Sequence, residues 1–106
     1  VFLGLPYDIA MYGLLLEMLA KGADLKAGQL IGQLGDCHLY TNHIKQSLEY
    51  IERPNRRLPE LKLEEGIRKS LKMDARGNII IPDPDQIKLI NYNPLPAIKA
   101  ELSVGK

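Results

Sequence analysis

Residues 1–22 read VFLGLPYDIAMYGLLLEMLAKG, and they set the architecture that the sequence predicts. Residues 1–5 are apolar and are followed by a proline, which favours a short buried strand. Asp8 then stands where a helix N-cap is common, and residues 9–21 are strong helix formers with apolar side chains on nearly every face. A helix of that kind is surrounded by protein, so we predict a long buried helix that ends at Gly22.

The rest of the chain combines extended segments with one more predicted helix. Residues 25–41 are extended in character and are interrupted by glycines, and the second helix is predicted to begin at Asn42 or His43 and to close at Pro54. Short strands are predicted at residues 61–63, 79–81 and 87–90. Because only two helices are predicted to cover several apolar strands, we expect upstream chain or a second subunit to supply the missing cover.

Composition limits the classes of protein that remain. The chain has 106 residues, a net charge of +1 and 45% hydrophobic residues, which suits one ordered domain at most. The charge argues against a nucleic-acid partner, and no apolar run approaches the roughly 20 residues of a membrane span. The single cysteine, Cys37, excludes an intrachain disulfide framework and fits a reducing compartment such as the cytoplasm. The abrupt apolar opening without methionine leads us to expect missing upstream chain.

Two polar side chains are candidates for ligand binding. His38 and Tyr40 lie two residues apart in an extended segment, so they share a face. They are either a polar pair on a sheet surface or two hydrogen-bonding groups aimed at a ligand hydroxyl. Asp8 also has two interpretations, as a helix cap or as a carboxylate that faces a ligand at the mouth of the helix.

Other chemical signals are weak. His43 follows His38 by five residues, but too few further nitrogen or sulfur ligands exist for zinc, so no metal site is predicted. We interpret Cys37 as a small buried apolar residue, because nothing places a base beside it. The glycines fit no phosphate-binding fingerprint. A basic loop is interpreted as solvated, and it contains Arg53, Arg56 and Arg57.

Four segments resemble the thymidylate synthase family. Residues 2–10, FLGLPYDIA, resemble its FLGLPFNIA stretch, and residues 34–43, LGDCHLYTNH, resemble its LGDxHxYxNH segment. Residues 53–61, RPNRRLPEL, are similar to REPRPLPKL, and residues 92–100, YNPLPAIKA, are similar to YDPHPAIKA. The segments keep the family's order and intervals along the whole chain, which makes the resemblance specific.

The resemblance implies an α/β (α+β) chain that is the C-terminal part of the thymidylate synthase fold, with a mixed sheet and a long buried helix. Residues 1–106 would then be the C-terminal part of one domain. The family transfers a one-carbon unit from 5,10-methylenetetrahydrofolate to C5 of a pyrimidine nucleoside monophosphate and forms homodimers. Its nucleophilic cysteine lies upstream of this chain and does not correspond to Cys37. We therefore expect no catalytic residue here and no turnover by these residues alone.

The resemblance also assigns binding roles. His38 and Tyr40 look like the pair that hydrogen-bonds the ribose 3′-hydroxyl, and Leu3 and Gly4 resemble positions that line the folate site. Asp8 replaces the family's base-reading asparagine. An asparagine amide both donates and accepts, which suits uracil, whereas an ionised carboxylate only accepts, which suits the N4 amino group of cytosine.

Three functions follow from these assignments. Asp8 favours hydroxymethylation of a cytosine nucleotide, as in deoxycytidylate hydroxymethylase. The first alternative is conventional conversion of dUMP to dTMP, with Asp8 protonated or turned away. The second is a non-catalytic nucleotide-binding or dimerisation module. The tail departs from the family too, because Gly105 and Lys106 extend beyond the usual terminal position.

Overall fold

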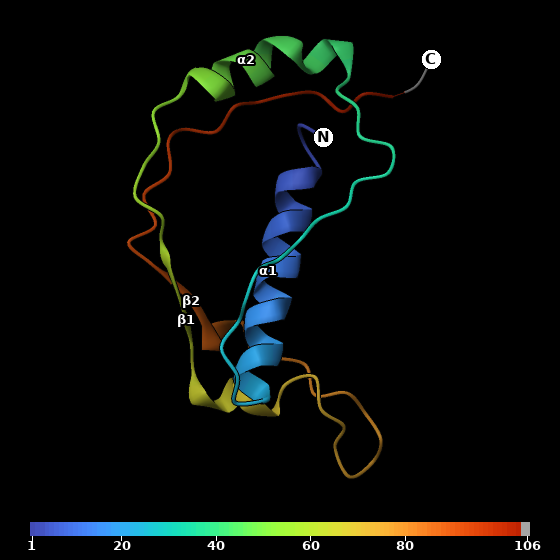
Figure 1. The fold of residues 1–106 in the computed structure, drawn as a ribbon, viewed down its shortest axis with the longest axis vertical. Helices are drawn as coiled ribbons and strands as arrows, with labels where there is room; N and C mark the ends of the chain where they lie inside the picture. The colour runs from blue at the N-terminus through green and yellow to red at the C-terminus, as the bar shows by residue number, and fades with distance from the viewer. Residues whose placement is uncertain (105–106) are drawn as a thin grey trace.

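The computed structural model of the protein describes residues 1–104, so the Gly105-Lys106 extension lies outside the described residues. Its secondary structure combines helices with a small sheet, which confirms the predicted α+β class (Figure 1). In chain order the elements are α1 (Leu5–Gly22), η1 (Thr41–His43), α2 (Ile44–Glu52), β1 (Glu60–Leu63), η2 (Glu65–Lys69), η3 (Pro84–Gln86) and β2 (Ile87–Ile90), where η denotes a 3-10 helix.

Helix α1 begins earlier than the sequence predicts. Gly4 is its N-cap, without a side-chain cap bond, and the amide of Asp8 donates to the Gly4 carbonyl at 3.2 Å within the first turn. The predicted strand at residues 1–5 and the predicted Asp8 cap are therefore wrong. The physical reason is Pro6, which tolerates the first turn of a helix because amides there have no helical partner.

Helix α1 ends at Gly22, as predicted, but the residue that caps this end is not the glycine. The left-handed residue is Asp24, with φ of 60°. The amide of Leu25 donates to Ala20 at 2.8 Å, and that of Asp24 donates to Lys21 at 3.2 Å. These two bonds make a Schellman motif, which satisfies the last carbonyls of the helix.

The sheet is smaller than predicted. Strands β1 and β2 pair antiparallel, with Glu60 opposite Ile90 and Leu63 opposite Ile87, so within residues 1–104 the sheet is antiparallel rather than mixed. Residues 79–81 were predicted as a strand but supply only one isolated bridge, to Met73. A strand needs a partner along its length, and here the chain turns back on itself in a short hairpin.

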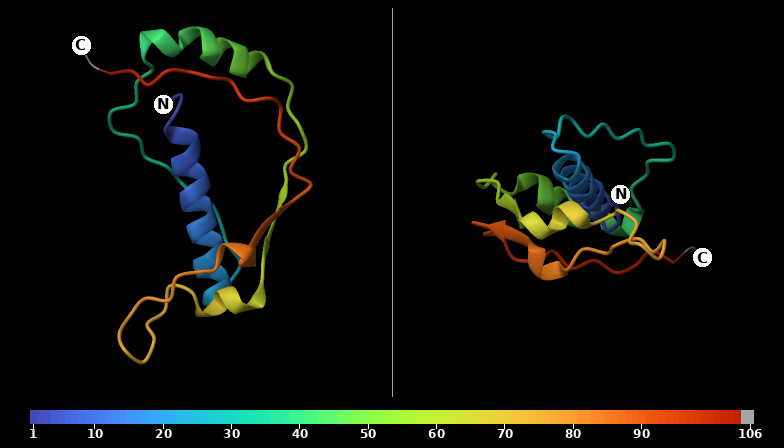
Figure 2. Two further views of the ribbon diagram at one scale, coloured as in Figure 1. Left: turned by 180° about the vertical axis from the view of Figure 1, so that it is seen from behind. Right: turned by 90° about the horizontal axis from the view of Figure 1, so that it is seen from below.

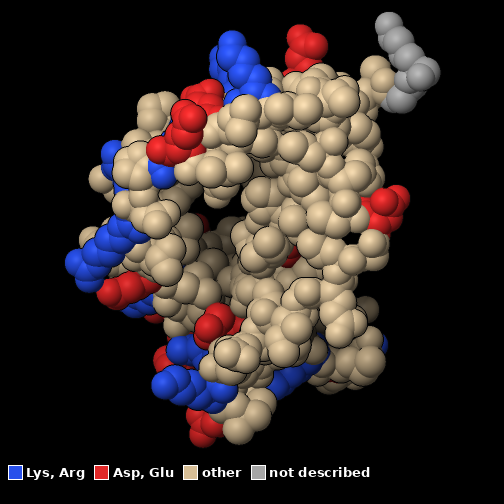
Figure 3. Space-filling model, turned by 45° about the horizontal axis from the view of Figure 1, so that its top comes forward, with Lys and Arg blue, Asp and Glu red and all other residues tan. Residues whose placement is uncertain are grey.

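The molecule is open. Its radius of gyration is 17.4 Å, whereas a compact chain of this length has about 13 Å. Helix α1 runs along the long axis, and α2, the strands and the C-terminal segment form an arc beside it (Figures 1 and 2). A hollow opens in the face that Figure 3 shows, and much of the surface around it is uncharged.

Burial within this chain is slight. Met18 and Ile67 are the buried hydrophobic residues of the described chain, and Met18 is the buried residue of α1. The helix is long, as predicted, but residues 1–104 leave most of its apolar faces uncovered, so the prediction of a buried helix is not met within the described chain.

Candidate functional site

Two segments that are distant in sequence meet near the start of α1. The backbone nitrogen of Val1 lies 2.9 Å from the carbonyl oxygen of His38. The ring of Phe2 packs against the imidazole of His43, with centroids 5.7 Å apart and planes at 47°. These contacts place the residues that precede α1 beside the segment that leads into α2.

His38 and Tyr40 lie together, as their spacing predicts. Their rings are 4.9 Å apart in an edge-to-face arrangement at 81°, a geometry that aromatic pairs favour. Both residues are exposed to solvent, which leaves their polar atoms accessible to a ligand. Asp36 Oδ1 lies 3.4 Å from His38 Nδ1, so Nε2 is the ring nitrogen left for another partner.

His43 is a residue of the site that reasoning about metal ligands missed. Its side chain is among the few buried ones, at 2% exposure, although it is polar. Its ring contacts Phe2 and also Tyr40, at 6.0 Å between centroids, and Nε2 lies 2.6 Å from the carbonyl oxygen of Glu101. The signal available in the sequence was its place at the end of the LGDCHLYTNH segment.

The remaining predicted residues lie at the start of α1. Leu3 is half-buried, and a Cβ built on Gly4 meets nothing within 4 Å, so the space beside that backbone is open. Asp8 is exposed, and within residues 1–104 its carboxylate has no hydrogen-bond or ion-pair partner. It lies three residues beyond Leu5, about 4.5 Å further along the helix axis.

Cys37 differs from its prediction. It is a free and exposed cysteine, not a buried apolar one. The segment from residue 25 to residue 40 has no assigned helix or strand, so no sheet packing covers it. That Cys37 is not the nucleophile stays a prediction.

Two of the three arginines in the basic loop are not simply solvated. Arg53 donates from Nη1 to the carbonyl of Pro96 at 2.6 Å, and Arg56 donates to the carbonyl of Asn93 at 3.3 Å. Arg57 is exposed, as predicted, and lies 3.8 Å from the carboxylate of Glu60. The loop therefore holds the C-terminal segment alongside the chain that leaves α2 (Figure 2).

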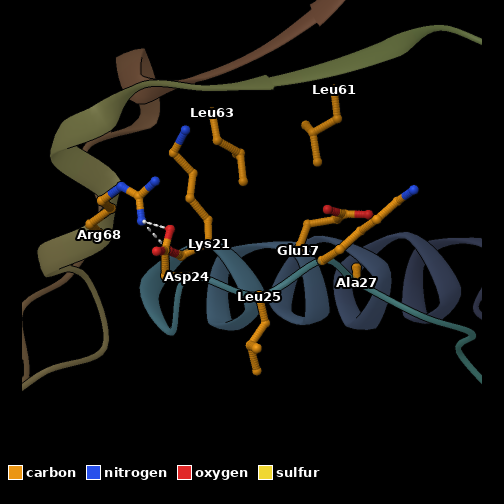
Figure 4. A pocket seen from close by; sticks show the side chains of 9 residues that line it. Glu17, Lys21, Asp24, Leu25, Ala27, Leu61, Leu63 and Arg68 are labelled. Carbon is orange, nitrogen blue, oxygen red and sulfur yellow. Dashed lines mark hydrogen bonds and ion pairs between the residues drawn. The ribbon is translucent and has the colours of Figure 1, made fainter.

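A separate cavity of about 360 Å³ lies at the other end of α1. Figure 4 shows Arg68 of η2 reaching Asp24, at 3.1 Å, and Arg68 also contacts Glu65, at 2.7 Å. Arg68, and then Lys21, lower the pKa of Glu65. None of the predicted binding residues lines this cavity, which contains Glu17, Lys21, Asp24, Leu25, Lys26, Ala27, Leu61, Leu63 and Arg68. It joins α1 to η2 and β1 and does not belong to the His38–Tyr40 site.

Membrane-spanning helices and metal centres are both absent from the part of the chain that the structure describes. Among residues 1–104 no helix combines the length and the apolar character needed to cross a bilayer. The same residues hold no group of three or more histidine, cysteine, aspartate or glutamate side chains arranged to bind a metal ion.

Comparisons with known proteins match the whole described chain. The family model for thymidylate synthase covers residues 1–104. The chain is 41% identical over 104 residues to a thymidylate synthase of Listeria monocytogenes, covering 98% of this chain and 30% of the relative. It is 43% identical over 103 residues to one from Francisella tularensis, covering 97% and 34%. It is 38% identical over 104 residues to one from Corynebacterium aurimucosum, covering 98% and 35%. The chain thus spans about a third of these relatives.

Proposed function

The chain belongs to the thymidylate synthase family, and we propose that it forms the C-terminal, nucleotide-facing part of an enzyme that transfers a one-carbon unit to C5 of a pyrimidine nucleoside monophosphate. The observation that carries the proposal is that His38, whose ring packs against Tyr40, lies beside Val1, a residue distant in sequence that precedes α1. The hydroxyl of Tyr40 and Nε2 of His38 both hydrogen-bond, and a ribose hydroxyl accepts and donates in the same way.

Conversion of dUMP to dTMP is the reaction that the relatives favour. They carry the name thymidylate synthase at about 40% identity, and that name supports the methylation of uracil more strongly than it supports hydroxymethylation. The one-carbon donor in this proposal is 5,10-methylenetetrahydrofolate. The open space beside Gly4 and the half-buried side chain of Leu3 suit one face of a flat ring system.

A second candidate, hydroxymethylation of dCMP, rests on Asp8. Its unpartnered carboxylate accepts a hydrogen bond from the N4 amino group of cytosine but repels O4 of uracil. Cytosine N3 carries no proton at neutral pH, so binding through both atoms requires protonation of N3 or of Asp8, or an intervening water molecule. With uracil, Asp8 must be protonated to donate to O4.

The choice between the two bases is tested by exchanging the carboxylate for an amide. In the longer enzyme that contains this chain, Asp8→Asn should shift the preference from dCMP towards dUMP by about 1–3 kcal/mol, the usual cost of an unpaired polar group. The measurement is kcat/KM for both nucleotides. Glu17→Gln makes the same chemical change further along α1, away from its start, and should leave the ratio unchanged. A ratio that Asp8→Asn does not move leaves the uracil reaction as the function.

The proposal places the nucleophile outside this chain, because the cysteine of the family motif lies upstream and the exposed Cys37 does not correspond to it. The 106 residues alone should therefore not release tritium from C5 of labelled dUMP or dCMP. If they bind a nucleotide without this exchange, they act as a binding module until joined to the rest of the enzyme. Tritium release by these residues alone would contradict the assignment.

We also propose that the longer enzyme is a homodimer. Among residues 1–104, 28 large apolar residues are exposed, including Ile9, Met11 and Leu19 of α1, and such surface needs cover in water. Sedimentation of the longer enzyme should give a dimer, whereas a monomer at all concentrations would contradict this part of the proposal.

A further inference from the structure

We propose that His43 is a positioning residue that couples the C-terminal segment to the His38–Tyr40 pair. The proposal goes beyond the nucleotide site itself, and it rests on the proposed function in that the pair is taken to bind a nucleotide. The imidazole of His43 contacts Tyr40 of the pair on one side and the carbonyl of Glu101 in the C-terminal segment on the other.

The C-terminal segment, residues 91–104, depends on side chains to hold it in place. Within the described residues it contains no helix or strand after β2 ends at Ile90. Arg56 and Arg53 fix its first part through the carbonyls of Asn93 and Pro96. Further along, Glu101 is fixed by His43, through a 2.6 Å bond to its carbonyl oxygen. His43 is thus the last anchor of the segment and the one nearest the site.

The chemistry of that bond fixes the state of the imidazole. A carbonyl oxygen only accepts, so Nε2 of His43 carries the proton and donates it. The ring is then held on two sides, by Phe2 at 5.7 Å and by Tyr40 at 6.0 Å between centroids. Because His43 is only 2% exposed and packs against both rings, we infer that a shift of the C-terminal segment is transmitted to the Tyr40 ring.

The link continues from Tyr40 to His38. These rings meet edge to face at 4.9 Å, and the ring of Tyr40 also meets that of His43, with their planes at 85°. A path of contacts therefore runs from the Glu101 carbonyl to His38. Its first link is the hydrogen bond to His43, and its next links are the ring contacts of His43 with Tyr40 and of Tyr40 with His38. The same imidazole contacts Phe2, which immediately precedes Leu3 and Gly4. One buried side chain thus joins the segment before α1, the pair and the C-terminal segment.

The test uses variants that break the link from either side in the longer enzyme. His43→Phe keeps a buried ring but removes the donor, and a stop after Ala100 removes the Glu101 carbonyl. His43→Gln keeps a donor. Ile67→Val is the matched control, because Ile67 is also buried but lies in η2, whose neighbours are α1 and η3.

Two measurements on each variant report the link. The rate of tryptic cleavage after Lys99 without ligand reports how well the C-terminal segment is anchored. The dissociation constants of dUMP and of dCMP report how well the His38–Tyr40 pair binds a nucleotide. In His43→Phe, loss of one hydrogen bond should raise the cleavage rate and the dissociation constant about fivefold each. His43→Gln should stay within about twofold of the unmodified enzyme, and so should Ile67→Val.

The most informative comparison combines the two perturbations. If His43 acts through the C-terminal segment, the stop after Ala100 raises the dissociation constant about fivefold, and His43→Phe adds little in that shortened background. Additive effects would overturn the coupling, and so would an unchanged dissociation constant when cleavage accelerates. Unchanged cleavage in His43→Phe would overturn the anchoring itself. If His43→Phe fails to fold, the shortened enzyme with native His43 tests the coupling through its own dissociation constant, and an unchanged constant there overturns it.

Failure of the proposed function would look different. In that case the unmodified enzyme binds neither dUMP nor dCMP. The link from His43 is then read from the NMR signals of the Tyr40 ring, which the stop after Ala100 should shift although it leaves Tyr40 and His43 unaltered. Tyr40 signals that stay in place would overturn the coupling without any reference to a nucleotide.

Discussion

Replacing Ile67 with alanine should be the most damaging single truncation in the chain. Ile67 is 1% exposed, the least exposed hydrophobic side chain in residues 1–104. It lies in η2, which packs against α1, where Gly22 lies close to the backbone of Arg68. A side chain buried in so small a core cannot be replaced by contacts elsewhere in the described chain.

The size of the effect follows from the atoms removed. Ile67→Ala deletes three carbon groups, each worth about 0.8 kcal/mol when buried, or roughly 2.4 kcal/mol in total. A rigid cavity would add to this, and measured losses for such truncations extend to about 5 kcal/mol. Here the neighbouring Leu63 and Arg68 border an open hollow and can relax inward. We therefore expect a loss of about 2.5–3 kcal/mol in the free energy of unfolding.

Urea unfolding of the longer enzyme, followed by far-ultraviolet circular dichroism, provides the measurement. Ile67→Val should cost about 1 kcal/mol. Ile81→Ala is the exposed control and should cost almost nothing, since Ile81 is 83% exposed. A loss below about 1 kcal/mol in Ile67→Ala, or an equal loss in Ile81→Ala, would refute the view that η2 is seated on α1 through this side chain.

Two further predictions concern charge and backbone. Arg68 and Lys21 lower the pKa of Glu65 in the folded chain, so this carboxylate stabilises the fold above its ordinary pKa, and the stabilisation is lost as the pH falls through the lowered value. Urea midpoints measured from neutral to acid pH should show that loss, and Glu65→Gln should flatten it. Gly77 has φ of 81°, where a side chain is strained, so Gly77→Ala should cost about 1 kcal/mol of unfolding free energy. Gly28→Ala, at a site without positive φ or close neighbours, should cost much less, and equal losses would exclude backbone strain as the cause.

Local signals predicted local structure well. The end of α1 at Gly22, the helix before Pro54 and the strand at residues 87–90 all follow from residues close in sequence. They were predictable because a helix end or a short strand is encoded by the side chains within a few positions of it. Pro6 shows the limit of such signals, because a proline both ends strands and opens helices.

Features that depend on distant partners were harder to predict. Residues 79–81 have the composition of a strand but lack an extended partner. Arg53 and Arg56 have the composition of a solvated loop, yet the carbonyls they bind lie about 40 positions away in sequence. No periodicity or propensity contains that information. For the candidate site, the spacing of His38 and Tyr40 predicted their pairing, while the contact of His38 with Val1 and that of Tyr40 with His43 depend on the folded chain.

The exposed faces of α1 connect these observations. A helix that is apolar all round is stable in water only when other surfaces cover it, and within residues 1–104 Met18 is the one residue of α1 that is buried. Relatives that are 41% and 43% identical to this chain are about three times as long, so they contain chain that this one does not. The apolar residues on the faces of α1 therefore indicate that α1 packs against protein outside the described chain. That supports the proposal that the His38–Tyr40 pair works as one wall of a site whose other walls, including the nucleophile, come from elsewhere in the enzyme.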